Sequence, residues 1–190
     1  MKILPLLAML AIVTTIQSAV AFSDARPSPV PTDLESFVTQ PGVVLDLAED
    51  VGSLHSTDAS VVVAAVIASD TGRPGERMQG LRFVMENNTG SDRAWLDETQ
   101  LAALLDELSG IETGIPELES GNSPYRVQGT GACWMPARPM RILCPSYRIG
   151  PDWAGLTLAV YGGRGFEYPG RRPAELAALI RLAAARLDEP

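Results

Sequence analysis

The stretch Leu101-Ala102-Ala103-Leu104-Leu105 recurs as Leu176-Ala177-Ala178-Leu179-Ile180, 75 residues further along the chain. The same displacement carries the segment 80–83, Gly-Leu-Arg-Phe, onto the segment 155–158, Gly-Leu-Thr-Leu. Self-similarity at one fixed spacing, in both a leucine-rich and an alternating segment, is typical of an internal repeat. The sequence therefore predicts a duplicated unit of about 75 residues.

The first unit contains four segments typical of β-strands, because each is short, apolar and rich in alternating or β-branched residues. The second of them, Val-Val-Val-Ala-Ala-Val-Ile, is continuously apolar, which favours a central position in a sheet. The first has alternating apolar residues, Val43, Leu45 and Leu47, and is expected to have one face covered. The four predicted strands cover residues 43–48, 61–67, 81–85 and 93–96, with a turn at 87–90.

A helix is predicted to begin after Asp97, which forms a capping box with Gln100. Its leucines at positions 101, 104, 105 and 108 have the spacing of one apolar stripe that can cover a sheet. Gly110 and Gly114 are predicted to end it.

The second unit repeats this order of elements. Its helix is predicted to begin at Pro173 and to have an apolar stripe at positions 176, 179, 180, 183 and 187. Its four strands are predicted at residues 125–134, 140–147, 156–161 and 166–168.

The predicted fold class is α+β, with an internally duplicated ββββα unit whose antiparallel sheets are each covered by a helix. Leu104 and Leu179 occupy equivalent positions in the two repeats, so both are expected to be deeply buried. The order of elements is similar to that of whirly-type and related duplicated nucleic-acid-binding folds. This resemblance concerns element order only and implies no activity or functional residues for the present chain.

The first 21 residues have the features of a secretory signal peptide: one lysine, an apolar run and an Ala-Val-Ala cleavage site before Phe22. Residues 22–37 contain three alternating prolines and are predicted to form an extended leader. The first repeat is expected at 38–113 and the second at 114–190, as one globular domain. The mature protein is accordingly expected to be secreted or periplasmic, with no membrane insertion.

The chain is acidic, with 23 Asp plus Glu against 15 Lys plus Arg. Residues 22–113 carry 16 acidic residues and 5 arginines, whereas residues 114–190 carry 7 acidic residues and 9 arginines. An acidic protein is a poor ligand for nucleic acid, because cationic side chains supply the affinity for phosphates. The uneven distribution instead favours a dipolar surface that attracts a protein partner or a second copy of the chain.

Two cysteines, Cys133 and Cys144, are predicted to form one structural disulfide in the oxidising exported compartment. A hairpin centred between Arg138 and Pro139 would place them directly opposite each other. A redox or metal-binding pair is the alternative interpretation, but the spacing is not CxxC and no companion ligands are evident.

No segment has the spacing of a known catalytic, metal or cofactor site. His55, the only histidine, lies near Ser53, Ser56 and Asp58, and is interpreted as a solvated loop residue and not as part of a hydrolytic triad. The segment 162–165, Gly-Gly-Arg-Gly, is interpreted as a hairpin turn, because a phosphate-binding loop requires a helix directly after it. The many carboxylates lack the spacing of a calcium loop.

Trp134 and Trp153 are the candidate interface residues, and packing within the core is the alternative for Trp134. The sequence favours an exported, non-catalytic binding protein that interacts with a protein partner or with itself. A cell-envelope hydrolase using carboxylates between the repeats, or a structural envelope component, are the alternatives. A polar pocket would favour the enzyme or a small ligand, and an exposed apolar patch with a tryptophan would favour a protein partner.

Overall fold

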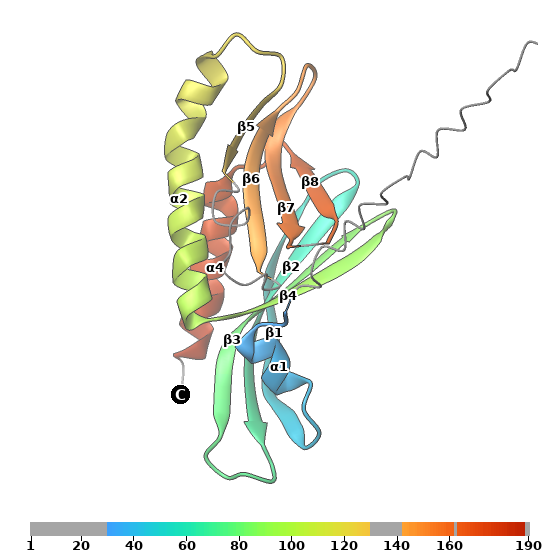
Figure 1. The fold of residues 1–190 in the computed structure, drawn as a ribbon, viewed down its shortest axis with the longest axis vertical. Helices are drawn as coiled ribbons and strands as arrows, with labels where there is room; N and C mark the ends of the chain where they lie inside the picture. The colour runs from blue at the N-terminus through green and yellow to red at the C-terminus, as the bar shows by residue number, and fades with distance from the viewer. Residues whose placement is uncertain (1–29, 130–141, 162, 189–190) are drawn as a thin grey trace, which may run out of the picture.

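A computed structural model of the chain describes residues 30–129, 142–161 and 163–188. It has an α+β fold with two four-stranded antiparallel sheets, each followed by a helix (Figure 1). In both sheets the strands are adjacent in chain order, which confirms the predicted fold class at this level. The first sheet contains β1 (Val43–His55), β2 (Ala59–Asp70), β3 (Arg77–Asn87) and β4 (Gly90–Asp97), and the second contains β5 (Arg126–Gly129), β6 (Leu143–Ile149), β7 (Ala154–Val160) and β8 (Gly165–Pro169). The helices are α1 (Asp33–Val38), α2 (Glu98–Ser120) and α4 (Pro173–Leu187).

Two glycines support the internal repeat. Gly80 in β3 lies opposite Asp97, and a Cβ added to Gly80 would overlap the carbonyl oxygen of Leu96 in β4. Gly155, 75 residues later in β7, lies opposite Pro169, and its added Cβ would overlap the carbonyl oxygen of Tyr168. The same close approach of the last two strands thus occurs in both units and requires glycine in both.

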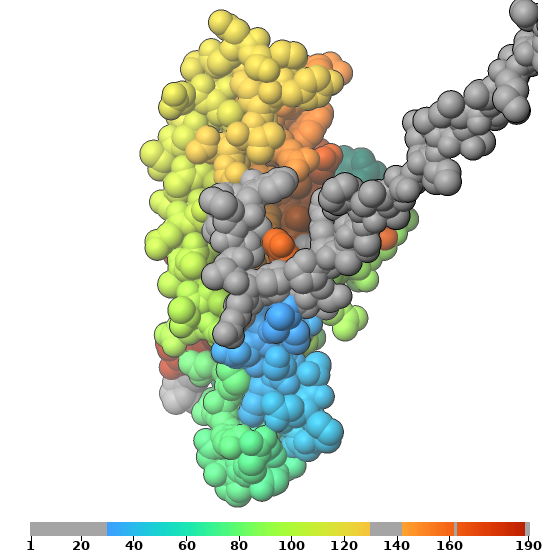
Figure 2. All heavy atoms as spheres, in the orientation of Figure 1, coloured from blue at the N-terminus to red at the C-terminus, as the bar shows by residue number. Residues whose placement is uncertain are grey.

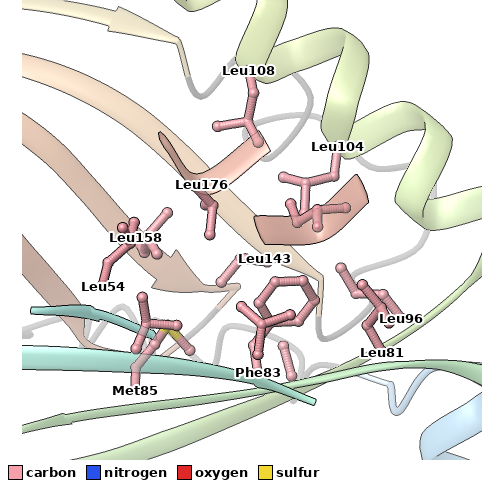
Figure 3. Packing of buried hydrophobic residues seen from close by; sticks show 14 of the residues in the cluster. Leu54, Leu81, Phe83, Met85, Leu96, Leu104, Leu108, Leu143, Leu158 and Leu176 are labelled. Atoms are coloured by element: carbon pink, nitrogen blue, oxygen red, sulfur yellow. The ribbon is translucent and has the colours of Figure 1, made fainter. Parts of the chain in front are cut away.

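Each long helix packs mainly against the sheet of the other repeat. Helix α2 follows the first sheet but lies against β5 and β6, whereas α4 follows the second sheet and lies against β1, β2 and β3. Leu104 and Leu108 of α2, Leu176 of α4, Phe83 and Leu158 meet in one apolar core (Figure 3). The two repeats therefore share a single core.

The prediction of an extended leader up to residue 37 is wrong for residues 33–37, because they belong to helix α1. Thr32 caps the helix by accepting a hydrogen bond from the Glu35 amide at 3.1 Å, and its hydroxyl donates to the Trp95 carbonyl at 2.6 Å. Leu34 is completely buried beside Gly80. The short helix thus covers the face of the first sheet opposite to α4, and the folded chain begins before Val38.

Helix α2 does not end at Gly110 or Gly114 as expected, but continues to Ser120 through Pro116. Ile111 and Ile115 extend the apolar stripe by two turns and pack against buried Tyr147 of β6. Glycine costs a helix only about 1 kcal/mol per residue. Burial of two isoleucines outweighs that cost, so the local stop signals are overridden.

Two burial expectations were also wrong. Leu179 is only partly buried at the edge of the core, where it packs over Gly52, whereas Leu104, Leu176 and Ile180 are buried. Leu45 is exposed, because β1 is an edge strand with a break in register between Leu45 and Leu47. Such a break moves later side chains to the other face.

In the part of the chain that the structure describes, no helix has both the length and the apolar character needed to cross a membrane.

Candidate functional site

The second sheet has one face in the core and one face directed away from it. Leu156 and Leu158 of β7 point into the core, so the alternate residues Gly155, Thr157 and Ala159 lie on the opposite face. The strand register places Ser146 and Glu167 on either side of Thr157. We call this opposite side the outer face of the second sheet, defined by Val127, Ser146, Arg148, Thr157 and Glu167.

One end of the outer face carries exposed apolar and aromatic side chains. Tyr125 is 71% exposed and Val127 is 55% exposed. Val127 lies opposite Arg148 in the sheet, and the same register continued by one residue places Tyr125 beside Gly150. We call Tyr125, Val127, Arg148 and Trp153 the aromatic patch.

Trp153 reaches this patch from the turn between β6 and β7. The Gly150 amide closes the turn by donating to the Trp153 carbonyl at 2.7 Å. A Cβ added at Gly150 would collide with the indole ring, so the ring lies over the Gly150 backbone. Since Tyr125 lies opposite Gly150 in the continued register, Trp153 lies next to Tyr125. Trp153, which the sequence indicated as a candidate interface residue, is half-buried.

The outer face also borders a polar pocket of about 260 Å³ between the two repeats, and Arg148 belongs both to the aromatic patch and to the lining of this pocket. Both repeats contribute its walls, through the β1–β2 turn, the β3–β4 turn and strands β6 to β8. Its polar lining residues are Ser56, Asp58, Asn87, Asn88, Arg148, Thr157 and Glu167. We call this space the inter-repeat pocket.

One hydroxyl in the pocket lining has no partner. Thr157 is 3% exposed, and its Oγ1 is buried without a hydrogen bond to any described residue. Arg148 and Glu167 form a loose ion pair at 4.0 Å, with both side chains about half exposed.

His55 is exposed and is not in a loop, because it is the last residue of β1. Its Nε2 lies 2.6 Å from the Ser53 hydroxyl, and its carbonyl accepts from Arg171 at 3.0 Å. A triad requires a carboxylate to orient the histidine. Among the described residues none does so, since Ser56 and Asp58 line the inter-repeat pocket instead.

The segment 162–165 lies in the connection between β7 and β8, and the described part agrees with the predicted hairpin turn. Arg164 donates to the backbone carbonyl of Thr89 at 2.6 Å and to its hydroxyl at 2.9 Å. Thr89 lies in the equivalent turn of the first repeat. Arg164 therefore joins two equivalent turns, and strand β8 follows where a phosphate-binding loop requires a helix.

Several carboxylates have structural partners. The Gly72 amide donates to Asp70 at 2.8 Å and Arg73 donates to it at 2.6 Å, and these bonds hold the pKa of Asp70 below its usual value. Glu112 of α2 accepts from Arg172 at 3.0 Å and from the Ala174 amide in the first turn of α4 at 3.3 Å. Across the described ranges, no cluster of three potential metal ligands occurs.

Cys133 and Trp134 lie outside the described residues, so only one partner of the predicted disulfide is described. Cys144 is buried in β6. In the described pairing of β5 with β6, Gly129 lies opposite Ser146. If Cys133 lay directly opposite Cys144 in one unbroken register, residue 131 would lie opposite Ser146 instead. The bridge thus stays a prediction, and direct opposition would need a shift in register beyond Gly129.

Sequence reasoning did not find the aromatic patch as a unit or the inter-repeat pocket. The alternation of Tyr125 and Val127 was visible, but which face the core covers depends on where α2 packs. The pocket joins the turns at residues 56–59 and 87–88 to β8 at residues 165–169, and no local pattern in the sequence indicates such a distant contact. Comparisons with protein-family models, curated proteins and solved structures found no match.

Proposed function

We propose that this chain is an exported, non-catalytic interaction protein that binds a protein partner through the aromatic patch. The observation that carries the proposal is the exposure of Tyr125 and Val127 beside Trp153 on one sheet face. Large apolar side chains gathered on a surface are typical of docking sites. Tyrosine, tryptophan and arginine are also the residues that contribute most binding energy in protein interfaces.

The partner chemistry follows from the charges beside the patch. Arg148 belongs to the patch and lies opposite Val127, so the apolar surface has a cationic group beside it. Side chains of this kind favour a partner with an apolar anchor next to carboxylates. A second copy of the chain is the other occupant, since its first repeat is acidic.

Site-specific photo-crosslinking in exporting cells tests the proposal. A photoreactive residue at Val127 is expected to give a discrete adduct, and Trp153→Ser should reduce it by about tenfold, as expected for a hot-spot residue. The matched control is the same photoreactive residue at Ala178, an exposed position on α4. An adduct of twice the monomer mass identifies self-association, and an adduct of another mass identifies a different partner. Equal labelling at Val127 and Ala178 would show that the patch is not an interface.

Export is part of the same proposal and has its own test. The mature protein is expected to begin at Phe22, because Ala19 and Ala21 supply the small residues that signal peptidases require. Mass spectrometry of the extracellular and periplasmic fractions measures this end. A protein that retains Met1 would contradict the exported location.

A cell-envelope hydrolase is the second candidate function, because Asp58 of the first repeat and Glu167 of the second line one pocket. Paired carboxylates flanking a substrate are the catalytic groups of most glycoside hydrolases. The test is release of reducing ends from purified envelope glycan by the wild type, Asp58→Asn and Glu167→Gln. Activity that both substitutions remove would support the hydrolase, and no release by the wild type would exclude this reaction.

A further inference from the structure

We propose that the inter-repeat pocket binds a small ligand that carries a protonated primary amine beside hydrogen-bonding groups. The pocket adjoins the aromatic patch and shares Arg148 with it, but the proposal does not depend on the proposed protein partner. It has not been assigned by any motif in the sequence, because its walls come from two turns of one repeat and three strands of the other.

The pocket walls are supported by hydrogen bonds that cross between the repeats. On one side, Arg171 donates to the His55 carbonyl at 3.0 Å, and the Ser56 hydroxyl is shared between the Ala59 and Glu167 carbonyls, each at 3.3 Å. On the other side, Arg164 holds the β3–β4 turn through Thr89. A site with such supports is organised before the ligand arrives, which lowers the entropic cost of binding.

The groups that line the pocket have unused hydrogen-bonding capacity. Thr157 Oγ1 is buried without a partner, whereas Asp58 and Asn88 are exposed at the pocket and their side chains make no hydrogen bond or ion pair within the described residues. Buried polar groups in native proteins usually have a partner, so an unpaired hydroxyl at a pocket needs an explanation. A bound polar ligand supplies one.

The charges select a cationic ligand. Arg148 is balanced by Glu167 at 4.0 Å, so Asp58 is the carboxylate in the pocket without a cationic partner among the described residues. An ammonium group donates three hydrogen bonds and bears the opposite charge. Asn88 can then pair with a hydroxyl or amide group next to the amine, and Thr157 can do so after its side chain rotates toward the pocket.

The volume limits the size of the ligand. About 260 Å³ is below the usual range for drug-sized ligands, so one sugar ring or a dipeptide is the appropriate scale. Amino sugars and peptide amino termini both combine an amine with neighbouring polar groups. The shared chemistry defines the proposal, and matched probes distinguish the two sources.

Titrations of the isotope-labelled full-length mature protein, followed by amide chemical shifts, test the proposal. The probes are glucosamine against glucose, and glycylglycinamide against its N-acetylated form. In one pair the amine is expected to bind about tenfold or more tightly than its neutral counterpart, with shifts at Gly165 and Asn88. The pair that shows the difference identifies the source of the amine.

Two variants localise the binding. Gly165→Val should abolish it, because the larger side chain occupies the pocket that Gly165 lines. The variant should still fold, since an added Cβ at Gly165 meets only Thr157 Cγ2, at 3.8 Å. Asp58→Asn should weaken amine binding by about tenfold or more, and Asp106→Asn, an exposed carboxylate on α2, should leave it unchanged. The proposal is wrong if no amine binds better than its neutral counterpart, or if amine binding survives both pocket variants.

Discussion

Gly80 and Gly155 connect the sequence repeat to the structure at the scale of single residues. Neither has a positive φ that would by itself require glycine. Both are required because a neighbouring backbone carbonyl occupies the space of a side chain. The pair thus records a backbone contact that both repeats retain.

We predict that Gly80→Ala and Gly155→Ala each destabilise the protein by about 1–3 kcal/mol, because the backbone of β4 or β8 must move away. Gly165→Ala is the matched control, since its added Cβ makes only an ordinary contact. Its stability should stay within about 0.5 kcal/mol of the wild type. Urea unfolding of the three variants measures this, and equal stability of all three would refute the close approach.

The second residue-scale prediction concerns Asp70. Its pKa is lowered in the folded state by the Gly72 amide and by Arg73. The carboxylate therefore stabilises the fold above its unfolded pKa, near 3.8, and this contribution is lost as the pH falls through the lower folded pKa. Asp70→Asn should be less stable than the wild type at pH 7, and the difference should shrink below about pH 4. A difference that stays constant between pH 7 and pH 3 in urea titrations would contradict this assignment.

At the scale of elements, the leucine stripes determine where the two long helices pack. Leu104 and Leu176 are buried in the shared core, whereas Leu179 lies at its edge. The equivalent residues Leu104 and Leu179 therefore differ in burial. The two helices pack against different sheets, α4 against the first and α2 against the second, so equivalent positions do not have equivalent surroundings.

We predict that Leu104→Ala and Leu176→Ala each cost about 2–5 kcal/mol, the range for core leucines. Leu179→Ala should cost less, about 1–2 kcal/mol, since only part of its side chain is buried. The exposed controls Asp106→Ala and Arg181→Ala should stay within about 0.5 kcal/mol. Thermal melts rank the five variants, and a neutral Leu176→Ala would mean that α4 is peripheral.

The two cysteines give another element-scale prediction. Cys133 and Cys144 are expected to be bridged in the exported protein, and a loop of this length contributes on the order of 3 kcal/mol. Thiol titration in denaturant without reductant should find no free thiol. Two titratable thiols would exclude the bridge, and reduction should lower the melting temperature without removing the far-UV circular dichroism signal.

At the scale of the whole molecule, the repeats are held together by exchanged helices and by charge. The elongated body in Figure 2 places the β2–β3 turn of the first repeat and the end of α2 at opposite ends. Arg172 of the second repeat pairs with Glu112 of the first at 3.0 Å, and Arg186 approaches Glu49 at 3.9 Å. Some of the arginines of the second repeat thus form ion pairs with acidic residues of the first repeat.

Because each helix covers the other sheet, we predict that neither half folds alone. Fragments 22–122 and 123–190, divided in the exposed segment after α2, should each lack a cooperative thermal transition. An equimolar mixture should regain one, since the missing helix then returns to each sheet. A sharp transition in either isolated fragment would show that the repeats are independent domains.

The sequence by itself determined the local features that depend on neighbouring residues. Alternation predicted most strands, the Asp97–Gln100 capping box predicted where α2 begins, and the 75-residue displacement predicted the repeat. Helix α1 was missed because three prolines precede it and its six residues are too few to show a periodic pattern.

Only the tertiary structure decided the features that depend on distant contacts. Burial of Ile111 and Ile115 against Tyr147 carried α2 through two glycines and a proline, and docking of α4 left Leu179 at the core edge. The exchange of helices between sheets, the exposure of Tyr125 and Val127, and the inter-repeat pocket have the same origin. Local propensities amount to about 1 kcal/mol per residue, or about 3 kcal/mol for a proline inside a helix, whereas packing of whole elements contributes more in total, so packing decides where the two disagree.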